Sequence, residues 1–272
     1  MTSVQKVIKY CAIGFAILLI VNIIFGILWA VGSLSGFLGL TVNTDINKNM
    51  EIIGTEQSNI NSLDIELWFT SLEIKRGNEF KVESNNSNIK YYSKNGNVEI
   101  KEKDSFFDFS SGNTNSAVIV YIPENIYNLY ELDVETSGGV VKIKDLQVSN
   151  FVFEQGTSET AIENLIVTNK VDIAGGAGKM DILSSNFNNL DLKLGVGEFN
   201  LSGVLTGNNE IESGIGNVNI NLTNGLDSYR IRTEKGVGMI NIGEKEMSNN
   251  EIYGSGITNI NIEGGIGNIS IN

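Results

Sequence analysis

Two groups of charged residues have the types and spacing that polysaccharide chemistry uses. Glycoside hydrolases place two carboxyl groups on either side of the bond they cleave, and polysaccharide lyases need a basic residue beside acidic ones. The two groups are Asp181 with Asp191, and Glu210 with Glu212 near Arg230 and Arg232. Solvation of an outward β-surface explains the same residues, so a polysaccharide-active enzyme is an alternative interpretation. We expect no catalytic residues.

The residue types that most other enzymes need are missing from the sequence. There is no histidine, which excludes imidazole as a general base or as a zinc ligand. Cys11 is the only cysteine, so the chain has no internal disulfide and no cysteine metal cluster. The stretch 175-GGAGKMDIL-183 is similar to a calcium-binding nonapeptide repeat, but Met180 stands where that repeat has its aspartate. We therefore expect no metal and no cofactor.

The repeated Gly-x-Gly motifs are structural rather than phosphate-binding. None of them continues into the Gly-Lys-Ser or Gly-Lys-Thr ending of a phosphate-binding loop. An aromatic group, Phe106, Phe107 and Phe109, stands in a polar connection and is a candidate partner surface. The alternative is that these rings cap the end of a β-stack.

The charge balance restricts the partners. The formal net charge is −13, and the only charges before residue 41 are Lys6 and Lys9, which leaves 17 positive and 32 negative groups, or −15, in the rest. Nucleic acids and anionic lipid surfaces are therefore not expected partners. A cationic partner is compatible with this balance, although solubility alone would also explain it.

Residues 11–40 form a charge-free apolar segment that is long enough to span a bilayer once. Lysines precede it and acidic residues follow it, so we expect a cytoplasmic tail at 1–10 and an extracellular C-terminal domain. Gly32 and Gly36 have the GxxxG spacing that lets two membrane helices pack closely. The segment predicts a single-pass protein of the cell membrane, with a cleaved signal peptide as the competing interpretation.

An internal repeat of about 20 residues predicts the fold. Seven segments align without gaps, and a last copy, 265-GIGNISI-271, follows after nine residues as half a coil. The seven segments are 137-SGGVVKI-143, 156-GTSETAI-162, 176-GAGKMDI-182, 195-GVGEFNL-201, 214-GIGNVNI-220, 236-GVGMINI-242 and 256-GITNINI-262. Large apolar residues recur at the fifth and seventh positions, which lie on one side of a strand. A second apolar strand lies between successive motifs.

This pattern predicts an all-β solenoid of two strands per coil, a parallel β-helix, with one transmembrane helix before it. Parallel crossovers are nearly always right-handed, so we expect that hand. The expected regions are a polar stalk at 41–62, an N-terminal β region at 63–135 that caps the solenoid, and the repeats at 136–272. Since the last strand has no evident cap, we expect weak self-association through residues 256–272.

The chain resembles the bacterial putative-adhesin family, a domain of unknown function. The residues that carry the resemblance are 118-VIVYIPENIYNLYELDVETSGGVVKIKDL-146, with Pro123 and the turn at 135–139, and the closing GIGNISIN. The resemblance implies a β-solenoid on the outer side of a bacterial membrane and carries over no active site. It favours a non-enzymatic surface protein that binds a cell-envelope polymer or protein. The alternative is an envelope-stress sensor that acts through its membrane helix.

Overall fold

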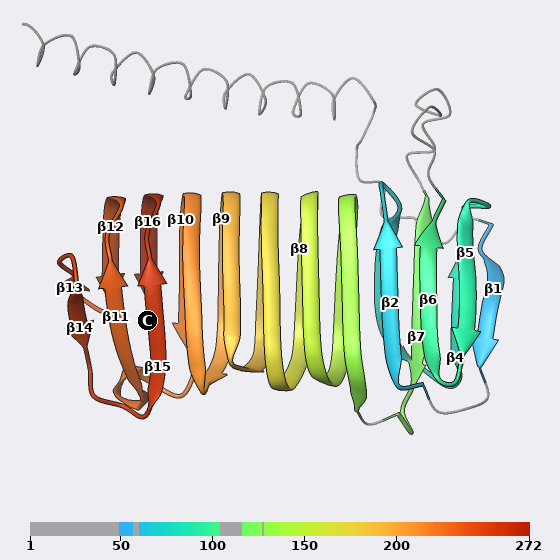
Figure 1. The fold of residues 1–272 in the computed structure, drawn as a ribbon, viewed down its shortest axis with the longest axis horizontal. Helices are drawn as coiled ribbons and strands as arrows, with labels where there is room; N and C mark the ends of the chain where they lie inside the picture. Colours follow the sequence, from blue (N-terminus) through green and yellow to red (C-terminus); the bar gives the residue numbers. More distant parts are fainter. Residues whose placement is uncertain (1–48, 57–59, 104–115, 127) are drawn as a thin grey trace, which may run out of the picture. The chain divides into compact units, whose positions relative to one another are not determined.

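The computed structural model in Figure 1 describes residues 49–56, 60–103, 116–126 and 128–272. These residues belong to one compact unit made of Asn47–Asp104 and Ser116–Asn272. The expected tail and membrane segment, 1–40, and the aromatic group Phe106, Phe107 and Phe109 lie outside the described residues. Within the described part, no helix is long and apolar enough to cross a membrane.

Nearly all of the regular structure is β. The only helix among the described residues is a short 3-10 turn, η1 (Leu226–Ser228). The strands are β1 (Glu51–Glu56), β2 (Ser62–Leu67), β3 (Ser71–Gly77), β4 (Phe80–Ser84), β5 (Ile89–Lys94), β6 (Asn97–Glu102), β7 (Ala117–Pro123), β8 (Leu129–Asn188), β9 (Leu190–Thr206), β10 (Asn208–Leu222), β11 (Tyr229–Glu234), β12 (Val237–Ile242), β13 (Lys245–Glu246), β14 (Glu251–Tyr253), β15 (Thr258–Glu263) and β16 (Ile266–Ile271).

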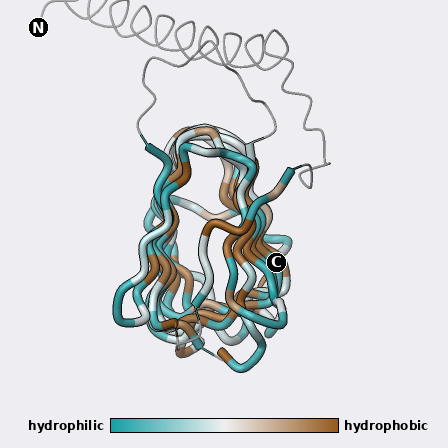
Figure 2. Tube along the Cα trace, turned by 90° about the vertical axis from the view of Figure 1, so that its right-hand side faces the viewer, coloured by the Kyte–Doolittle hydropathy of each residue, from teal (hydrophilic) through white to brown (hydrophobic). Residues whose placement is uncertain are grey.

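Each middle coil has three sides instead of the predicted two. The coil of β9 pairs with the preceding coil of β8 in three parallel ladders: 190–194 with 171–175, 196–201 with 177–182, and 203–206 with 185–188. We call the first side wall A, the second wall B and the third the short side. Walls A and B meet at a tight turn, the glycine corner, which is the upper edge in Figures 1 and 2.

The predicted inward positions form the core. Aliphatic and aromatic side chains alternate with polar ones along each strand, so stacking coils buries one side of every wall. The fifth and seventh positions of the aligned segments are buried at Val141, Ile143, Met180, Ile182, Phe199, Leu201, Val218, Ile220, Ile240 and Ile242. The prediction of inward aliphatic columns is therefore confirmed for these segments.

The N-terminal residues extend the same stack. β2 lies in wall A between β6 and β8, and β3 lies in wall B between β7 and β8, all in parallel register. Antiparallel strands then end both walls: β5 pairs with β6, and β4 and β1 follow β7. β1 falls within the range predicted as a polar stalk, so the ordered stack begins by Glu51.

Tyr91 joins the two walls at this end. Its ring lies against Gly54, where a Cβ atom would overlap the ring. Its hydroxyl donates a hydrogen bond to Glu56 Oε1 at 3.3 Å, and burial raises the pKa of Tyr91 to about 12. β1 is therefore held by a side chain from the opposite wall as well as by β4.

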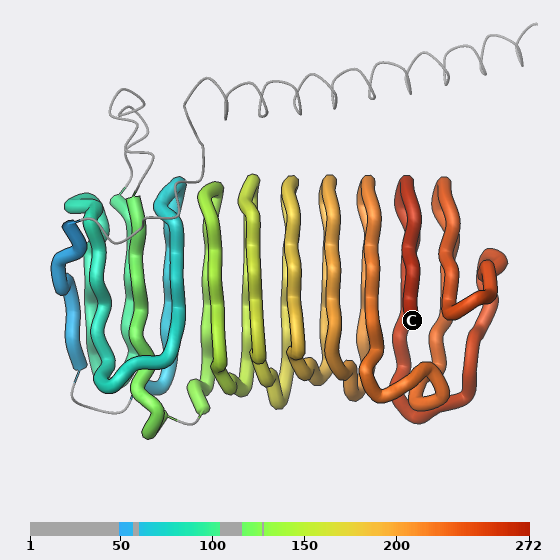
Figure 3. The backbone as a smooth tube through the Cα atoms, turned by 180° about the vertical axis from the view of Figure 1, so that it is seen from behind, coloured from blue at the N-terminus to red at the C-terminus, as the bar shows by residue number. Residues whose placement is uncertain are grey.

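The last coil in sequence is not the last coil in space. β15 lies in wall A between β10 and β11, and β16 lies in wall B between β10 and β12. Figures 1 and 3 show this coil, the darkest red, with an orange coil on either side. The chain leaves β10, builds the outer coil of β11 and β12, turns back through β13 and β14, and then fills the space it had left.

This order corrects two predictions. The segment 256-GITNINI-262 is a wall A strand, so it is not a seventh glycine-corner unit, and 265-GIGNISI-271 completes a full coil. The C-terminal strand is also not an open edge, because β16 is paired on both sides. The Asn272 amide donates to Ile220 O at 2.9 Å, and the Leu222 amide donates to Asn272 O at 2.7 Å. Self-association through an open edge at 256–272 is therefore not expected.

Candidate acidic face

A group of carboxylates covers the outer side of wall A at the N-terminal end of the stack. Three neighbouring strands contribute it: β6, β2 and residues 131–136 of β8. We call the surface the acidic face and define it by Glu99, Asp64, Glu66, Glu131, Asp133 and Glu135, with Lys101. The alternation that buries Leu63, Ile65, Leu132 and Val134 turns these side chains outward.

Lys101 is the cation within the acidic face. Its Nζ lies 2.8 Å from Glu66 Oε1, 3.6 Å from Asp64 Oδ2 and 3.9 Å from Glu99 Oε2. The hydrogen bond to Glu66 raises the pKa of the Lys101 ammonium group. Lys90 of β5 pairs in register with Lys101, and Lys94 lies on the same side of β5. Six carboxylates and these three lysines leave the face negative.

Asp133 has the most perturbed carboxyl group of the face. Burial, followed by the neighbouring charges of Asp64 and Glu131, raises its pKa to about 6. In the parallel register Asp133 lies directly beside Asp64, and like charges in that position repel. Burial also raises the pKa of Asp64, although Lys101 opposes that change.

Two exposed aromatic side chains flank the acidic face. Tyr92 of β5 is 57% exposed and pairs in register with Glu99. Trp68, directly after β2, is 41% exposed. Glu102 fixes this turn, because it accepts hydrogen bonds from the Trp68 amide at 2.8 Å and from Thr70 Oγ1 at 2.8 Å. The face therefore combines fixed carboxylates with accessible ring surfaces.

The opposite wall pairs its charges internally. Lys81 Nζ lies 2.7 Å from Glu83 Oε1, and Lys75 Nζ lies 3.2 Å from Glu73 Oε1. Both ammonium groups also lie over the ring of Tyr121, at 4.4 and 5.2 Å from its centroid. The unbalanced charge of this end is thus on wall A.

The structure does not assemble the residue groups predicted for polysaccharide chemistry. Asp181 points outward from wall B and Asp191 from wall A, since their ladder partners belong to different walls. Asp181 is engaged with Lys179 Nζ at 2.9 Å and Asn200 Nδ2 at 2.7 Å. In the other group, β15 separates the carboxylates from the arginines: Glu210 pairs with Asn261, and Asn261 pairs with Arg232.

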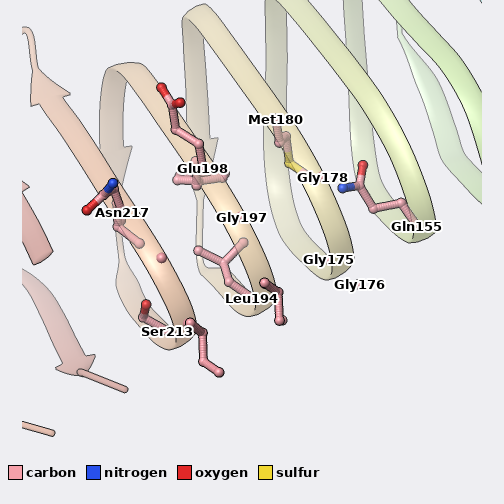
Figure 4. Close-up of a pocket in the computed structure, with 16 residues that line it drawn as sticks. Gln155, Gly175, Gly176, Gly178, Met180, Leu194, Gly197, Glu198, Ser213 and Asn217 are labelled. Carbon is pink, nitrogen blue, oxygen red and sulfur yellow. The ribbon is translucent and has the colours of Figure 1, made fainter. Parts of the chain in front are cut away.

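The glycine corner encloses only a small cavity between Gln155 and Val218. Figure 4 shows its cavity, which measures about 20 Å³ and is lined by glycines together with Gln155, Met180 and Phe199. That volume holds about one water molecule, whereas ligand sites occupy a few hundred Å³ or more. Across the described residues, no group of three or more Cys, Asp or Glu side chains is arranged to hold a metal ion.

Sequence comparison assigns the family. The model of the family described as Toastrack DUF4097 matches residues 40–255. The chain belongs to this family. The matched residues of this Toastrack chain begin before β1 and end in the loop between β14 and β15. They include all of the acidic face. No protein with a curated function matches the sequence.

Two solved structures match this chain along most of its length. One is a "putative cell adhesion protein" from Clostridium sporogenes, 18% identical, with 82% of this chain and 97% of that chain covered and a TM-score of 0.39. Another is a "putative adhesin" from Bacteroides fragilis, 11% identical, with 83% and 98% covered and a TM-score of 0.41.

Proposed function

We propose that this chain is a non-enzymatic surface protein, tethered to a cell membrane by residues 11–40, that binds a cationic cell-envelope partner through the acidic face. The observation that carries the proposal is the charge contrast between the two walls. Wall A presents six carboxylates with Lys101 over three strands, beside Tyr92 and Trp68, and Lys90 and Lys94 of the neighbouring β5 offset only part of this charge. Wall B neutralises its own charges.

The chemistry of the acidic face specifies the kind of partner. Carboxylates bind ammonium and guanidinium groups through charge-assisted hydrogen bonds, and exposed aromatic rings add cation–π contacts. Negative potential also steers a cationic partner toward the face and repels anionic ones. The partner is therefore a protein or polymer of the envelope that carries several positive groups in an extended arrangement.

Site-specific photocrosslinking on intact cells tests this proposal. A photoreactive residue at Tyr92 on wall A is compared with one at Asn219, which is exposed on wall B. We expect one dominant adduct from position 92 that weakens at high salt, because salt screens exposed charges. Replacing Glu66, Asp133 and Glu135 by their amides should remove the adduct. Equal adducts from both walls, or an adduct that survives the amide substitutions, would refute the proposal.

A further inference from the structure

The glycine corner carries an apolar column that is exposed at its C-terminal end. Ala177, Val196, Ile215, Ile266 and Val237 follow one another in the parallel ladders from coil to coil. Ile266 lies in an interior coil and is still 53% exposed, and Val237 is 71% exposed. Ala177, Val196 and Ile215 are half-buried, so the exposed apolar surface lies mainly at Ile266 and Val237. We call Val196, Ile215, Ile266 and Val237 the corner ridge.

From residue 137 onward the glycine corner carries one charged residue, Lys235, whose Nζ lies 3.1 Å from Glu246 Oε1. The corner turn between β6 and β7 differs, since it includes the exposed Lys103 and, outside the described residues, Asp104 and Asp108. The other corner positions are small, hydroxyl and aliphatic residues: 137–139, 156–158, 175–178, 194–197, 213–216, 264–267 and 236–238. At the N-terminal end the edge continues into Phe69, which is 67% exposed and rests on Gly138, and into Trp68 beside it. An edge with so few charges and with exposed aromatic side chains at one end is unusual on a chain of net charge −13.

The chain from the expected membrane segment reaches the stack at this same edge. Glu51, the first residue of β1, pairs with Ser84, and Ser84 pairs with Val118. Val118 pairs with Leu72, the second residue of β3. β3 directly follows the corner turn that contains Trp68 and Phe69, so β1 begins close to this turn. Only ten residues, 41–50, separate the end of the expected membrane segment from β1. Fully extended they span at most about 36 Å, which holds this edge close to the bilayer.

We propose that the glycine corner docks edge-on against the surface of the bilayer, with the corner ridge and Phe69 in contact with lipid. The inference rests on the tether of the proposed function. Tethering keeps the edge at a high effective concentration near the lipid, so a shallow apolar contact is sufficient. Walls A and B then stand upright from the membrane, and the acidic face remains open at the side.

The remaining charge gives this contact a distinctive salt response. Carboxylates on both walls repel anionic lipid, whereas the corner ridge makes apolar contacts that salt does not screen. Contact should therefore be strongest on zwitterionic vesicles. On anionic vesicles it should increase as salt is added, the reverse of an electrostatic attachment.

Depth-dependent quenching in vesicles tests the docking. The full chain, with Cys11 replaced by serine, carries one fluorophore on I266C or, as the control, on N186C, which lies on the short side opposite the corner. The vesicles are phosphatidylcholine with a quencher on the lipid. We expect quenching at position 266 at least about threefold stronger than at 186. The substitutions Phe69→Ser and Val237→Ser, both at exposed side chains, should reduce it to the control level.

The outcomes separate the docking from the tether. A chain that alkaline washing removes from the vesicles would overturn the tether, and the docking with it. A retained chain with equal quenching at both positions would overturn the docking alone. Crosslinks between the ridges of two copies, without lipid quenching at 266, would also overturn it and assign the ridge to self-association.

Discussion

The inserted position of the last coil can be tested by two pairs of engineered cysteines. In the structure Asn219 pairs with Ser270, and Ser270 pairs with Asn241, so the last coil separates Asn219 from Asn241. If the coils followed one another in sequence order, Asn219 and Asn241 would be direct neighbours. In a Cys11→Ser background, one variant combines Asn219→Cys with Ser270→Cys, and the other combines Asn219→Cys with Asn241→Cys.

The spacing of β-strands decides which pair can form a disulfide. Adjacent strands lie about 4.8 Å apart, so two strands with one coil between them are about 9.6 Å apart. A disulfide needs Cα atoms about 4.4–6.8 Å apart. The pair at 219 and 270 fits, and the pair at 219 and 241 does not. Because the first bond closes a loop of 51 residues, the loop-entropy estimate adds about 4 kcal/mol to the free energy of unfolding.

Mild oxidation followed by mass spectrometry of the linked peptides gives the result directly. We expect nearly complete disulfide formation for 219 with 270, a higher melting temperature after oxidation, and background levels for 219 with 241. The reverse outcome, with efficient bonding of 219 to 241 only, would show that the coils follow sequence order and would refute the inserted arrangement.

Three further substitutions test the core, the corner and the acidic face. Ile220→Asp puts an unpaired charge at a buried position, so the free energy of unfolding measured in urea should fall by several kcal/mol. Gly197→Ala should cost about 2 kcal/mol or more, because its Cβ would overlap Gly178 O; Gly175→Ala, with ordinary contacts, is the control and should cost clearly less. Asp133→Asn should stabilise the chain by about 1 kcal/mol at pH 7.5, the pKa shift being discounted for solvent screening. Because the pKa of Asp133 is raised in the native state, the native state favours the protonated carboxyl group. The gain in stability from Asp133→Asn should therefore shrink as the pH falls from about 6 to 3.8 and vanish below pH 3.8. Urea titrations at several pH values would show this change.

The repeat made the core predictable because burial depends on the alternation of apolar and polar residues along each strand. A strand with apolar residues at every second position buries one side wherever it lies in the stack, so Ile182 and Phe199 could be placed from the sequence alone. The structural role of the glycines was also predictable from the sequence. A Cβ on Gly197 or Gly216 would overlap the carbonyl oxygen of the glycine in the preceding coil, so nothing larger fits.

The order of the coils was not predictable from that alternation. The segment 256-GITNINI-262 has the same spacing of glycine and isoleucine as a corner segment, although its strand belongs to wall A. Local pattern specifies which side chains point inward and does not specify the neighbouring coil. Two irregularities signalled the exception: the nine-residue interval before 265 and the close match of 265-GIGNISI-271 with 214-GIGNVNI-220, its true neighbour.

The acidic face was within reach of the sequence but was not found. Its strands read LDIEL, NVEIK and ELDVE, and each of them alternates acidic and apolar residues. Their adjacency could not be derived, because β2 lies beside β6 and β8, which are 35 and 69 residues further along the chain. Stacking order again carries the missing information.

The inserted coil also protects the C-terminal end of the stack against unwinding. Open strand edges pair with other chains unless they are short, irregular or covered. At the C-terminal end the outermost pairings are brief and antiparallel, β13 on β12 and β14 on β11, and the buried Met247 between them donates its amide to Ile240 O at 2.8 Å. Peeling away these strands would not release the chain terminus, because β15 and β16 are held between two other coils. The end can therefore fray without starting to unwind the stack.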